Sequence, residues 1–488
     1  MLRSIILLFI TTLVQAGASA PAPVSVKLHP KEAGQAVPMS FAGFSREWRR
    51  FPYADTGRPE TVHPKYLQLL RNLCAFNDKA LSIRIGGASA DGIKEVPDAN
   101  RWQQIRQVYE ATRTPLIITL NLARGDVQFC KDFIHRAKEH LPAEAIAGFE
   151  LGNEPDGWFG RHRPKDYRWE TYFDEFAAMR AALVPGEIRQ VIGPAWAHGL
   201  PPDIAATLLK MNPGALSMFT GHAYSLSPKT GPHPEKLLIA DVVPKTVTFL
   251  TPGIQAAHEA GLPFRLGECG SAWGGGIPGV SDSFASALWI MDFCMSLAEA
   301  GLDGVNFHGG GKGHYSPIQD DSDDKKFFTR SITPKPSYYG LLLFAEATAH
   351  RARFIPVERS TDEKVRLWAT LDEKGTRRLL IINKHLDQPI TVQLNTESTS
   401  HLTLKRLTAP AIGATEGIRI GGQTFDGSTD GLLVGTAHFE TPPPPPVRHS
   451  PDHTYCCKRS AGHVEVKRQE CPTDSAHHRA SRSITHPW

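Results

Sequence analysis

The chain has 488 residues, of which 41% are hydrophobic and 21% are charged, an ordinary composition for a globular protein with a large core. This balance excludes a disordered, collagen-like or disulfide-scaffold chain. The net charge is +4, and the last 48 residues, with seven Lys and Arg against four Asp and Glu, carry most of it. The body of the chain is close to neutral, so nothing in it indicates nucleic-acid binding.

The N-terminus has the pattern of a secretory signal peptide. Arg3 is followed by an apolar run from Ile5 to Val14 and then by small residues up to Ala20. The apolar run is too short to span a bilayer as a stable helix. We therefore predict a signal peptide over residues 1–20 and a secreted or periplasmic mature protein without a membrane segment. An apolar N-terminal strand is the alternative.

The cysteine pattern argues against a metal or redox site. The seven cysteines include no C-x-x-C pair. Four of them lie in or beside apolar segments and are expected as buried thiols: Cys74, Cys130, Cys269 and Cys294. The Cys456-Cys457 and His477-His478 pairs near the C-terminus lack a recognised ligand spacing. We predict that the protein binds neither a metal nor a cofactor.

Eight short apolar runs alternate with helix-like segments along most of the chain. The runs are residues 41–45, 81–85, 116–120, 146–151, 190–193, 218–221, 264–267 and 304–307. Helical patterns cover residues 167–183, 246–259, 281–300 and 337–350. This alternation predicts an α/β protein built on a (β/α)8 TIM barrel. A doubly wound open sheet is the rival, weakened because no G-x-G-x-x-G follows an early strand.

The pattern changes after the last of these helices. We assign residues 41–350 to the catalytic barrel. Short strand-like runs separated by turns predict a C-terminal β-sandwich over residues 351–440, and residues 21–40 are expected to add an N-terminal strand to it. Five prolines from Pro442 to Pro446 then open a Pro- and His-rich tail with almost no Leu, Ile or Phe. We predict that this tail, residues 441–488, is disordered.

Two glutamates lie at the ends of predicted barrel strands. Glu154, in Asn153-Glu154-Pro155, follows the fourth strand, and Glu268 ends the seventh. In a (β/α)8 barrel the C-terminal ends of the strands face the active site, so both carboxylates should point into one cleft. Glycoside hydrolysis needs such a pair, one carboxylic acid to protonate the leaving oxygen and one carboxylate to attack the sugar or direct a water.

The surroundings of the two glutamates suggest their roles. Asn153 precedes Glu154 and can hydrogen-bond a sugar 2-hydroxyl, a contact that strengthens in the transition state. We predict that Glu154 is the acid/base, with its pKa raised by the ionised Glu268 nearby. Glu268 is then the nucleophile. A separation of about 5–5.5 Å between the two carboxyl groups would imply retention of configuration.

Longer strings around these residues resemble glycoside hydrolase family 79, one of the (β/α)8 families of retaining glycosidases with glutamates on strands four and seven. The strings are residues 84–91, 149–155, 280–289 and 304–310, and the likeness covers roughly residues 23–435. The family includes β-glucuronidases and heparanase. The resemblance implies that Glu154 is the acid/base and Glu268 the nucleophile.

The resemblance also implies residues that bind the sugar. Tyr224 matches a tyrosine near the nucleophile, and Tyr315 matches a tyrosine that contacts the substrate carboxylate. Glu47, Asp91 and Asn153 match positions that line the sugar subsite.

The chain departs from the family pattern in two places. Trp273 stands where some relatives have a tyrosine, and we count it among the substrate-binding residues because its ring, like those of Trp158 and Trp196, could stack on a sugar. The polar tail stands where relatives finish the β-domain, so we expect a sandwich edge without a partner.

The predicted function is that of a secreted, retaining β-glucuronidase. It would remove terminal β-linked glucuronic acid, or its 4-O-methyl form, from glycans by double displacement. The glycine-rich loop that ends at Tyr315 offers backbone N–H groups, a phenol and Lys312 to the uronate carboxylate. The alternatives are an endo-acting, heparanase-like glycosidase, which needs a cleft lined with Lys and Arg, and a catalytically silent glycan-binding protein. The oligomeric state is not predicted.

Overall fold

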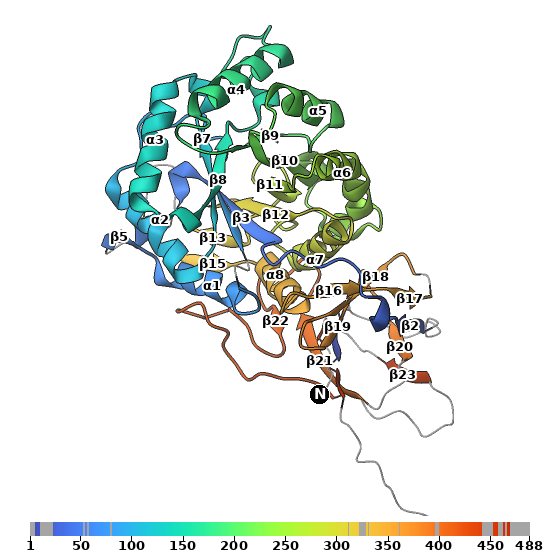
Figure 1. The fold of residues 1–488 in the computed structure, drawn as a ribbon. Coiled ribbons are helices and arrows are strands. Elements are labelled where there is room, and N and C mark those ends of the chain that lie inside the picture. The colour runs from blue at the N-terminus through green and yellow to red at the C-terminus, as the bar shows by residue number, and fades with distance from the viewer. Residues whose placement is uncertain are drawn as a thin grey trace, which may run out of the picture.

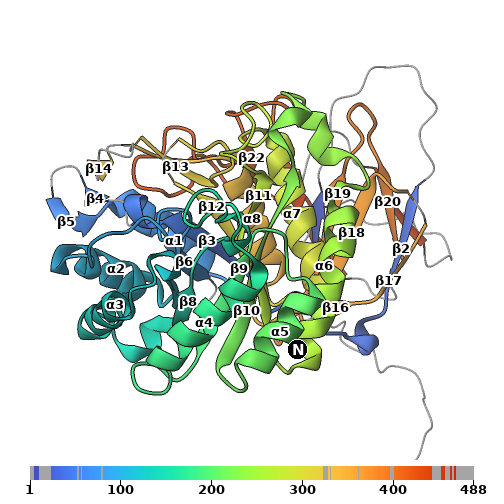
Figure 2. The same ribbon diagram turned by 90° about the horizontal axis from the view of Figure 1, so that it is seen from above.

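The structure of the protein is a computed structural model. It describes residues 5–9, 23–51, 54–55, 58–78, 81–310, 312–321, 328–329, 331–360, 362–395, 400–441, 452–456, 462–463 and 466–468. In Figure 1 a ring of helices surrounds a central group of strands, and a second group of sheets lies at the lower right. Figure 2 shows these sheets beside the barrel.

The central strands form a closed barrel in which every neighbouring pair is parallel. Its strands are β3 (Ala42–Glu47), β6 (Ser82–Gly86), β7 (Leu116–Leu120), β8 (Ile146–Leu151), β9 (Val191–Trp196), β10 (Leu216–Leu226), β11 (Phe264–Ala272) and β12 (Gly304–Gly309). Each of them overlaps one of the eight predicted apolar runs. The (β/α)8 barrel is therefore confirmed, and the open doubly wound sheet is excluded.

Helices cover the outside of the barrel. They are α1 (Pro64–Cys74), α2 (Ala99–Thr112), α3 (Val127–His140), α4 (Trp169–Leu183), α5 (Pro202–Met211), α6 (Val242–Glu259), α7 (Phe284–Glu299) and α8 (Pro336–Ala347). The local sequence explains where several of these helices begin. Asp98 and Asp126 cap α2 and α3, each carboxylate accepting a backbone N–H at 2.9 Å. Proline opens α1, α5 and α8, where no N–H is needed.

Short pairings complete the rim of the barrel. Strands β4 (Ala54–Asp55), β5 (Arg58–Val62) and β14 (Phe328–Thr329) form one small sheet. Strands β13 (Ile318–Asp320) and β15 (Ile332–Pro334) form another.

The second group of sheets is a β-sandwich. One sheet has the order β16 (Arg353–Ile355), β18 (Val365–Leu371), β19 (Arg377–Asn383), β1 (Ile5–Phe9), β21 (Ser400–Thr408) and β22 (Arg419–Ile420). The other has the order β17 (Val357–Arg359), β2 (Val24–Leu28), β20 (Thr391–Asn395) and β23 (Asp452–Cys456). Alternate apolar residues meet between the sheets, for example Val365, Leu367, Leu379 and Ile381, as period-two patterning requires.

The larger sheet of the sandwich also packs against the barrel. Its other face carries Trp368, Leu380 and Ile382, which belong to the barrel core. Helix α7 is mostly apolar and buried along nearly its whole length. Helix α8 and strand β11 of the barrel pack against it, and Arg366, Trp368 and Lys384 of the sandwich contact its side chains. The sandwich is thus joined to the helix that follows the strand of Glu268.

A buried ion cluster lies in this contact between barrel and sandwich. Asp292 of α7 is fully buried and pairs with Arg366 Nε of β18 at 3.0 Å. Lys384, which follows β19 and is fully buried as a side chain, forms an ion pair with the other Asp292 oxygen. Each buried charge therefore depends on a partner from the other region.

Residues 409–435 differ from the predicted sandwich, because, apart from β22, they lie outside the sheets, and several of them pack against the barrel. The Phe425 ring lies 5.3 and 5.1 Å from the rings of Tyr338 and Tyr339 on α8. Lys65 of α1 donates to the carbonyl of Ser428 at 2.6 Å. The segment is rich in glycine and lacks alternating apolar residues, so beyond β22 it extends no ladder.

Both ends of the chain contribute strands among the described residues. Strand β1 pairs in parallel with β19 and β21; the rest of residues 1–20 lies outside the described residues, and the signal peptide stays a prediction. Within the predicted tail, β23 pairs with β20, and β24 (Gly462–His463) and β25 (Val466–Arg468) pair with β21. These strands lie where we expected an unpartnered edge. The other tail residues are outside the described part, so disorder there stays a prediction.

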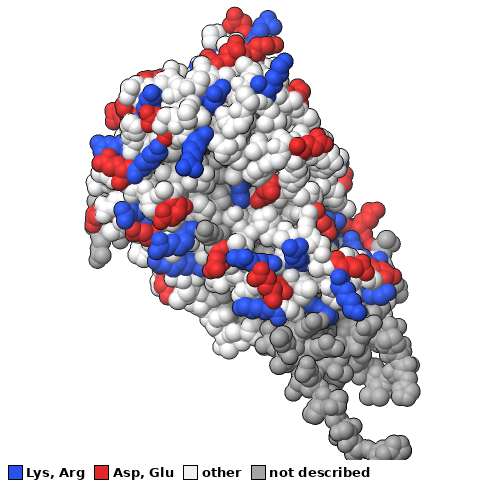
Figure 3. All heavy atoms as spheres, in the orientation of Figure 1, with Lys and Arg blue, Asp and Glu red and all other residues white. Residues whose placement is uncertain are grey.

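The surface carries charges of both signs. On the face drawn in Figure 3, Lys and Arg are interspersed with Asp and Glu, in keeping with the near-neutral body. Among the described helices, none combines the length and apolarity that a bilayer span requires.

Candidate active site

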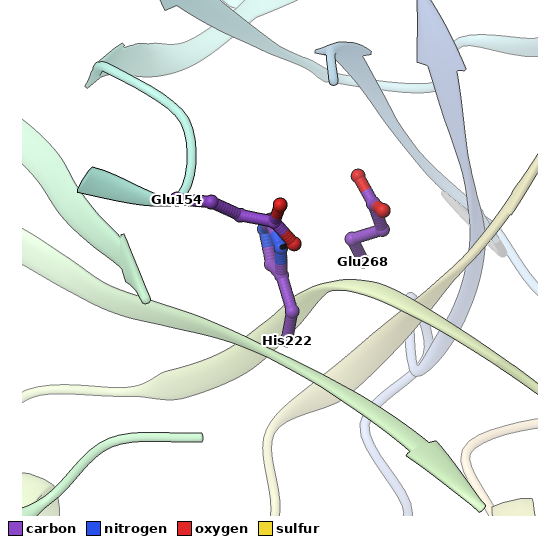
Figure 4. A group of neighbouring side chains, drawn as sticks. All are labelled: Glu154, His222 and Glu268. Atoms are coloured by element: carbon purple, nitrogen blue, oxygen red, sulfur yellow. Dashed lines mark hydrogen bonds and ion pairs between the residues drawn. The ribbon is translucent and has the colours of Figure 1, made fainter. Parts of the chain in front are cut away.

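Two carboxylates face each other at the C-terminal ends of the barrel strands. Glu154 follows β8 in a left-handed conformation (φ 46°), and its backbone N–H donates to Ala195 O at 3.0 Å. Glu268 lies within β11 and is only 7% exposed. Three atoms lie within 4.8 Å of one another: one carboxylate oxygen of Glu154, one of Glu268 and a ring nitrogen of His222. Figure 4 shows the two carboxylates on either side of one gap.

His222 of β10 holds the Glu154 carboxylate. Its Nδ1 lies 2.9 Å from Glu154 Oε1, and the ring is fully buried. Its Nε2 has no hydrogen-bond partner within the described part of the chain, so the contact with Glu154 is what holds the ring by its polar atoms there.

The pKa of Glu154 is lowered, contrary to the prediction. Burial raises it, but the hydrogen bond and charge of His222, together with the positive charges of Arg84 and His308, outweigh that effect. The prediction considered only the repulsion from Glu268 and left out the cationic and donor groups that the barrel brings to the same place.

Two hydrogen bonds and an ion pair hold the Glu268 carboxylate. Tyr224 donates to Oε1 at 2.6 Å, while Arg84 Nη1 and His308 Nδ1 each lie 3.3 Å from Oε2. Burial and the charge of Glu268 raise the pKa of Tyr224 well above its usual value, so its phenol remains a donor. This arrangement fixes the orientation of the Glu268 carboxylate.

Arg84 contacts residues of both strands that carry the two glutamates, from inside the barrel. It lies in the middle of the second barrel strand, β6, and is fully buried. It donates from Nε to Glu150 at 2.7 Å and from Nη2 to Asn153 Oδ1 at 2.9 Å. Glu150 also accepts bonds of 2.7 Å from Thr119 and Thr220. This satisfied polar layer fills the barrel beneath the two catalytic candidates and sets the orientation of Asn153.

Glu47 forms an ion pair with His308. Its Oε1 lies 3.4 Å from His308 Nε2, and its Oε2 accepts the Ser89 N–H at 2.8 Å. Although burial raises the pKa of Glu47, the bond and charge of His308 and the bonds from Ser89 lower it to about 2. Gly87 makes room for this carboxylate, since a Cβ there would lie 2.6 Å from Glu47 Oε1 and its φ is +67°.

Asp91 and Asn153 are joined through Trp158. Asp91 accepts the Asn153 backbone N–H at 3.3 Å and the Trp158 indole N–H at 2.9 Å. Burial raises the pKa of Asp91 to about 7, against the effect of these bonds and of Arg84. Trp158 is buried and therefore cannot offer a face to a sugar, and the same holds for Trp196.

The two predicted tyrosines lie together, whereas Trp273 does not join them. The Tyr315 ring lies 6.0 Å from the ring of Tyr224 and 5.7 Å from that of His308. Trp273 follows β11 with its side chain 52% exposed. Within the described residues, no contact links this side chain to the other site residues.

Three residues at the centre of the site were not among the predicted site residues: Arg84, His222 and His308. For His222 a signal was present, because residues two apart on a strand point to the same side and Tyr224 was already assigned. Arg84 and His308 lie in segments that resemble family 79, but the resemblance was not used to assign either residue a role.

The same side chains bear on metal binding. One oxygen from each of Glu154 and Glu268 and one nitrogen of His222 are close enough to hold a divalent cation, and such donors suit Zn²⁺. The prediction that the protein needs no metal or cofactor therefore remains to be tested. The other pairs considered, in the C-terminal tail, have side chains outside the described residues.

Comparisons with known proteins agree with the resemblance to glycosidases. No family model matches the chain. A β-glucuronidase from Aspergillus niger is 24% identical over 65% of this chain and 66% of its own length. The heparanase-like protein 3 of Arabidopsis thaliana is 24% identical over 67% of this chain and 66% of its own length. The chain thus spans just under two thirds of the length of these relatives.

The fold has a matching solved structure as well. A 4-O-α-L-rhamnosyl-β-D-glucuronidase from Fusarium oxysporum superposes with a TM-score of 0.73 over 91% of this chain and all of that one, at 19% identity. The relatives and the shared fold confirm the resemblance suggested by the motifs: in sequence and in fold, this chain is related to the glycosidases of family 79.

Proposed function

We propose that the protein is a retaining glycoside hydrolase that removes terminal β-linked glucuronic acid, or its 4-O-methyl form, from glycans. The observation that carries the proposal is the pair Glu154 and Glu268, with carboxylate oxygens within 4.8 Å across one gap. Retaining enzymes hold their carboxyl groups about 5–5.5 Å apart, whereas inverting enzymes leave room for a water between them.

In the first step the Glu268 carboxylate attacks the anomeric carbon. A bond forms between this carbon and a Glu268 oxygen while the bond to the leaving oxygen breaks and its electron pair stays on that oxygen. Glu154 transfers its proton there. Tyr224 and Arg84, which hold Glu268 in the free protein, orient it for the attack.

In the second step water releases the sugar. Glu154, now ionised, accepts a proton from water as the water oxygen attacks the anomeric carbon, and the ester bond to Glu268 breaks with its electrons returning to the carboxylate. Two inversions leave the product in the configuration of the substrate. The His222 hydrogen bond, which stabilises ionised Glu154, favours this base role.

The uronate specificity rests on the groups around Tyr315. The Tyr315 ring lies beside those of Tyr224 and His308, and Tyr315 offers a phenol donor of the kind that a carboxylate requires. Lys312 is exposed and has no part in this arrangement. The names of the Aspergillus and Fusarium proteins, both glucuronidases, support the same substrate.

Export of the protein belongs to the same proposal. Its support is the sequence pattern of the first 20 residues, and its test is the N-terminal sequence of the protein recovered from the medium or periplasm.

The experiment is hydrolysis of aryl β-glucuronides by the purified full chain, with the matching β-glucoside as comparison. We expect phenol release from the glucuronide. Release from the glucoside alone would reject the uronate claim. Retained activity in EDTA is expected, whereas a loss that Zn²⁺ restores would point to a metal at Glu154, His222 and Glu268.

Two variants separate the roles of the glutamates. Glu268→Gln should lower the rate by at least about 10³-fold for every substrate. Glu154→Gln should cost much less when the leaving phenol is acidic than when it is weakly acidic, because an acidic phenol needs little protonation. Glu259→Gln, exposed on α6, is the control. A parent that never hydrolyses a glycan and a Glu268→Gln variant that still binds it would indicate the silent binding protein instead.

A further inference from the structure

The loop between β8 and α4, residues 158–168, is firmly attached to the candidate site. Trp158 donates its indole N–H to Asp91 and to the Asn153 carbonyl, the latter at 2.8 Å. Arg163 lies over the Trp158 ring at 5.2 Å and pairs with Glu175 of α4 at 2.9 Å. These contacts make the loop a preorganised extension of the strand that carries Glu154.

The loop presents exposed aromatic rings. Phe159 is 46% exposed, and Trp169, the first residue of α4, is 41% exposed. Their ring centroids are 6.0 Å apart, and Trp169 rests against the buried Trp196 at 4.9 Å. Trp169 is therefore held in place from below while one part of its ring remains free for a saccharide.

The same loop is basic. Arg161, Lys165 and Arg168 are exposed, and none of the three forms an ion pair within the described chain. Asp166 is the single acid from Phe159 to Arg168. Burial and the charges of Arg161 and Arg163 lower the pKa of His162, as expected in a region of positive potential.

The position of the loop indicates which part of a substrate it meets. Glu154 protonates the oxygen of the leaving group in the proposed function, so the leaving saccharide lies on the side of Glu154. The loop continues from Glu154, and Asp156 fixes it to the end of β9 by accepting the Ala197 N–H at 2.9 Å. Both exposed rings and all three cations thus belong to the leaving-group side.

We propose that Phe159, Trp169, Arg161, Lys165 and Arg168 form a subsite for an acidic saccharide on the leaving-group side of the scissile bond. Trp169 stacks on a sugar ring, and the cations bind its carboxylate or sulfate groups. The inference rests on the proposed function and adds to it the class of leaving group.

The test compares three glucuronides: an aryl glucuronide, a neutral oligosaccharide with terminal β-glucuronic acid, and a sulfated oligosaccharide of the same length. The first variant replaces Arg161, Lys165 and Arg168 by glutamine, and the second is Trp169→Ala. The control for charge replaces Arg136, Lys210 and Lys245 by glutamine, which are exposed on α3, α5 and α6. Phe249→Ala, 53% exposed on α6, is the aromatic control.

The triple loop variant should lose about tenfold in kcat/KM on the sulfated oligosaccharide, since exposed ion pairs contribute modestly and add up, and should lose most of the salt dependence. Trp169→Ala should lose about fivefold on both oligosaccharides. Neither variant should change hydrolysis of the aryl glucuronide. Equal rates for the parent and both loop variants on the sulfated substrate would overturn the subsite, as would an equal loss on all three substrates.

Failure of the proposed function gives a different result. In that case the parent hydrolyses none of the three glucuronides. Calorimetric titration of the sulfated oligosaccharide into Glu268→Gln, with and without the loop substitutions, still tests the subsite, and unchanged affinity would overturn it.

Discussion

At the scale of single residues, the pH dependence of the site rests on His222. This ring donates to Glu154 and helps to keep the pKa of that carboxyl low. His222→Phe removes the donor and leaves an apolar ring, so the pKa of Glu154 should rise. The acid must be protonated to act, and the alkaline limb of kcat/KM reports its pKa in the free enzyme. The limb should therefore move to higher pH, while kcat falls.

The control for this prediction is Tyr224→Phe. It removes a donor to Glu268 and leaves the partner of Glu154 in place. It should lower the rate without moving the alkaline limb. An unchanged limb in His222→Phe would show that His222 does not set the pKa of Glu154.

The sequence predicted the residues whose role follows from position alone, and missed those defined by contacts. Glu154 follows strand four and Glu268 lies in strand seven, and their meeting follows from the barrel. Arg84 is different, because its partners Glu150, Asn153 and Glu268 come from distant segments. Only barrel closure brings them together, and with them the charges that reverse the predicted pKa shift of Glu154.

At the scale of elements, the packing of α7 on α8 depends on Gly340. A Cβ at this position would lie 2.5 Å from both Ala287 O and Ile290 Cγ2, closer than these atoms permit. Gly340→Ala should therefore lower the free energy of unfolding by about 1–3 kcal/mol, the usual range for overpacking. Gly186→Ala is the control, because nothing lies within 4 Å of a Cβ there. Urea unfolding measures both, and equal stability would contradict the close packing.

The elements themselves were largely readable from periodicity. Apolar runs marked every barrel strand, but β10 and β11 continue well past them, to Leu226 and Ala272. The added residues include Tyr224 and Glu268, polar side chains beyond the apolar part of each strand, which a search for apolar runs passes over. The functional ends of the strands were thus the part that the pattern underestimated.

At the scale of the whole molecule, the sandwich is tied to the barrel through Asp292. Asp292→Ala leaves Lys384 buried without its counter-ion, which should cost about 3–5 kcal/mol in unfolding. Glu110→Ala, which breaks an exposed pair with Arg106 on α2, should cost less than about 1 kcal/mol. Thermal unfolding checks both, and an Asp292→Ala protein as stable as Glu110→Ala would mean that the cluster does not hold the two regions together.

This arrangement of the two regions was not predicted from sequence. The sequence predicted a helix over residues 281–300, but did not identify what covers it. Residues 409–435 likewise carry no pattern that distinguishes a sandwich loop from a segment packed on α1 and α8. Contacts between distant parts of the chain decide both.

The most direct test of the paired glutamates is the anomeric configuration of the first product. Proton NMR of an aryl β-glucuronide reaction, followed from the earliest minutes, distinguishes the two anomers before they interconvert. Glucuronic acid released first as the β-anomer is the result expected when Glu268 attacks and Glu154 supplies and then takes back the proton. The α-anomer as the first product would require a single displacement by water and would contradict the assignment of Glu268 as nucleophile.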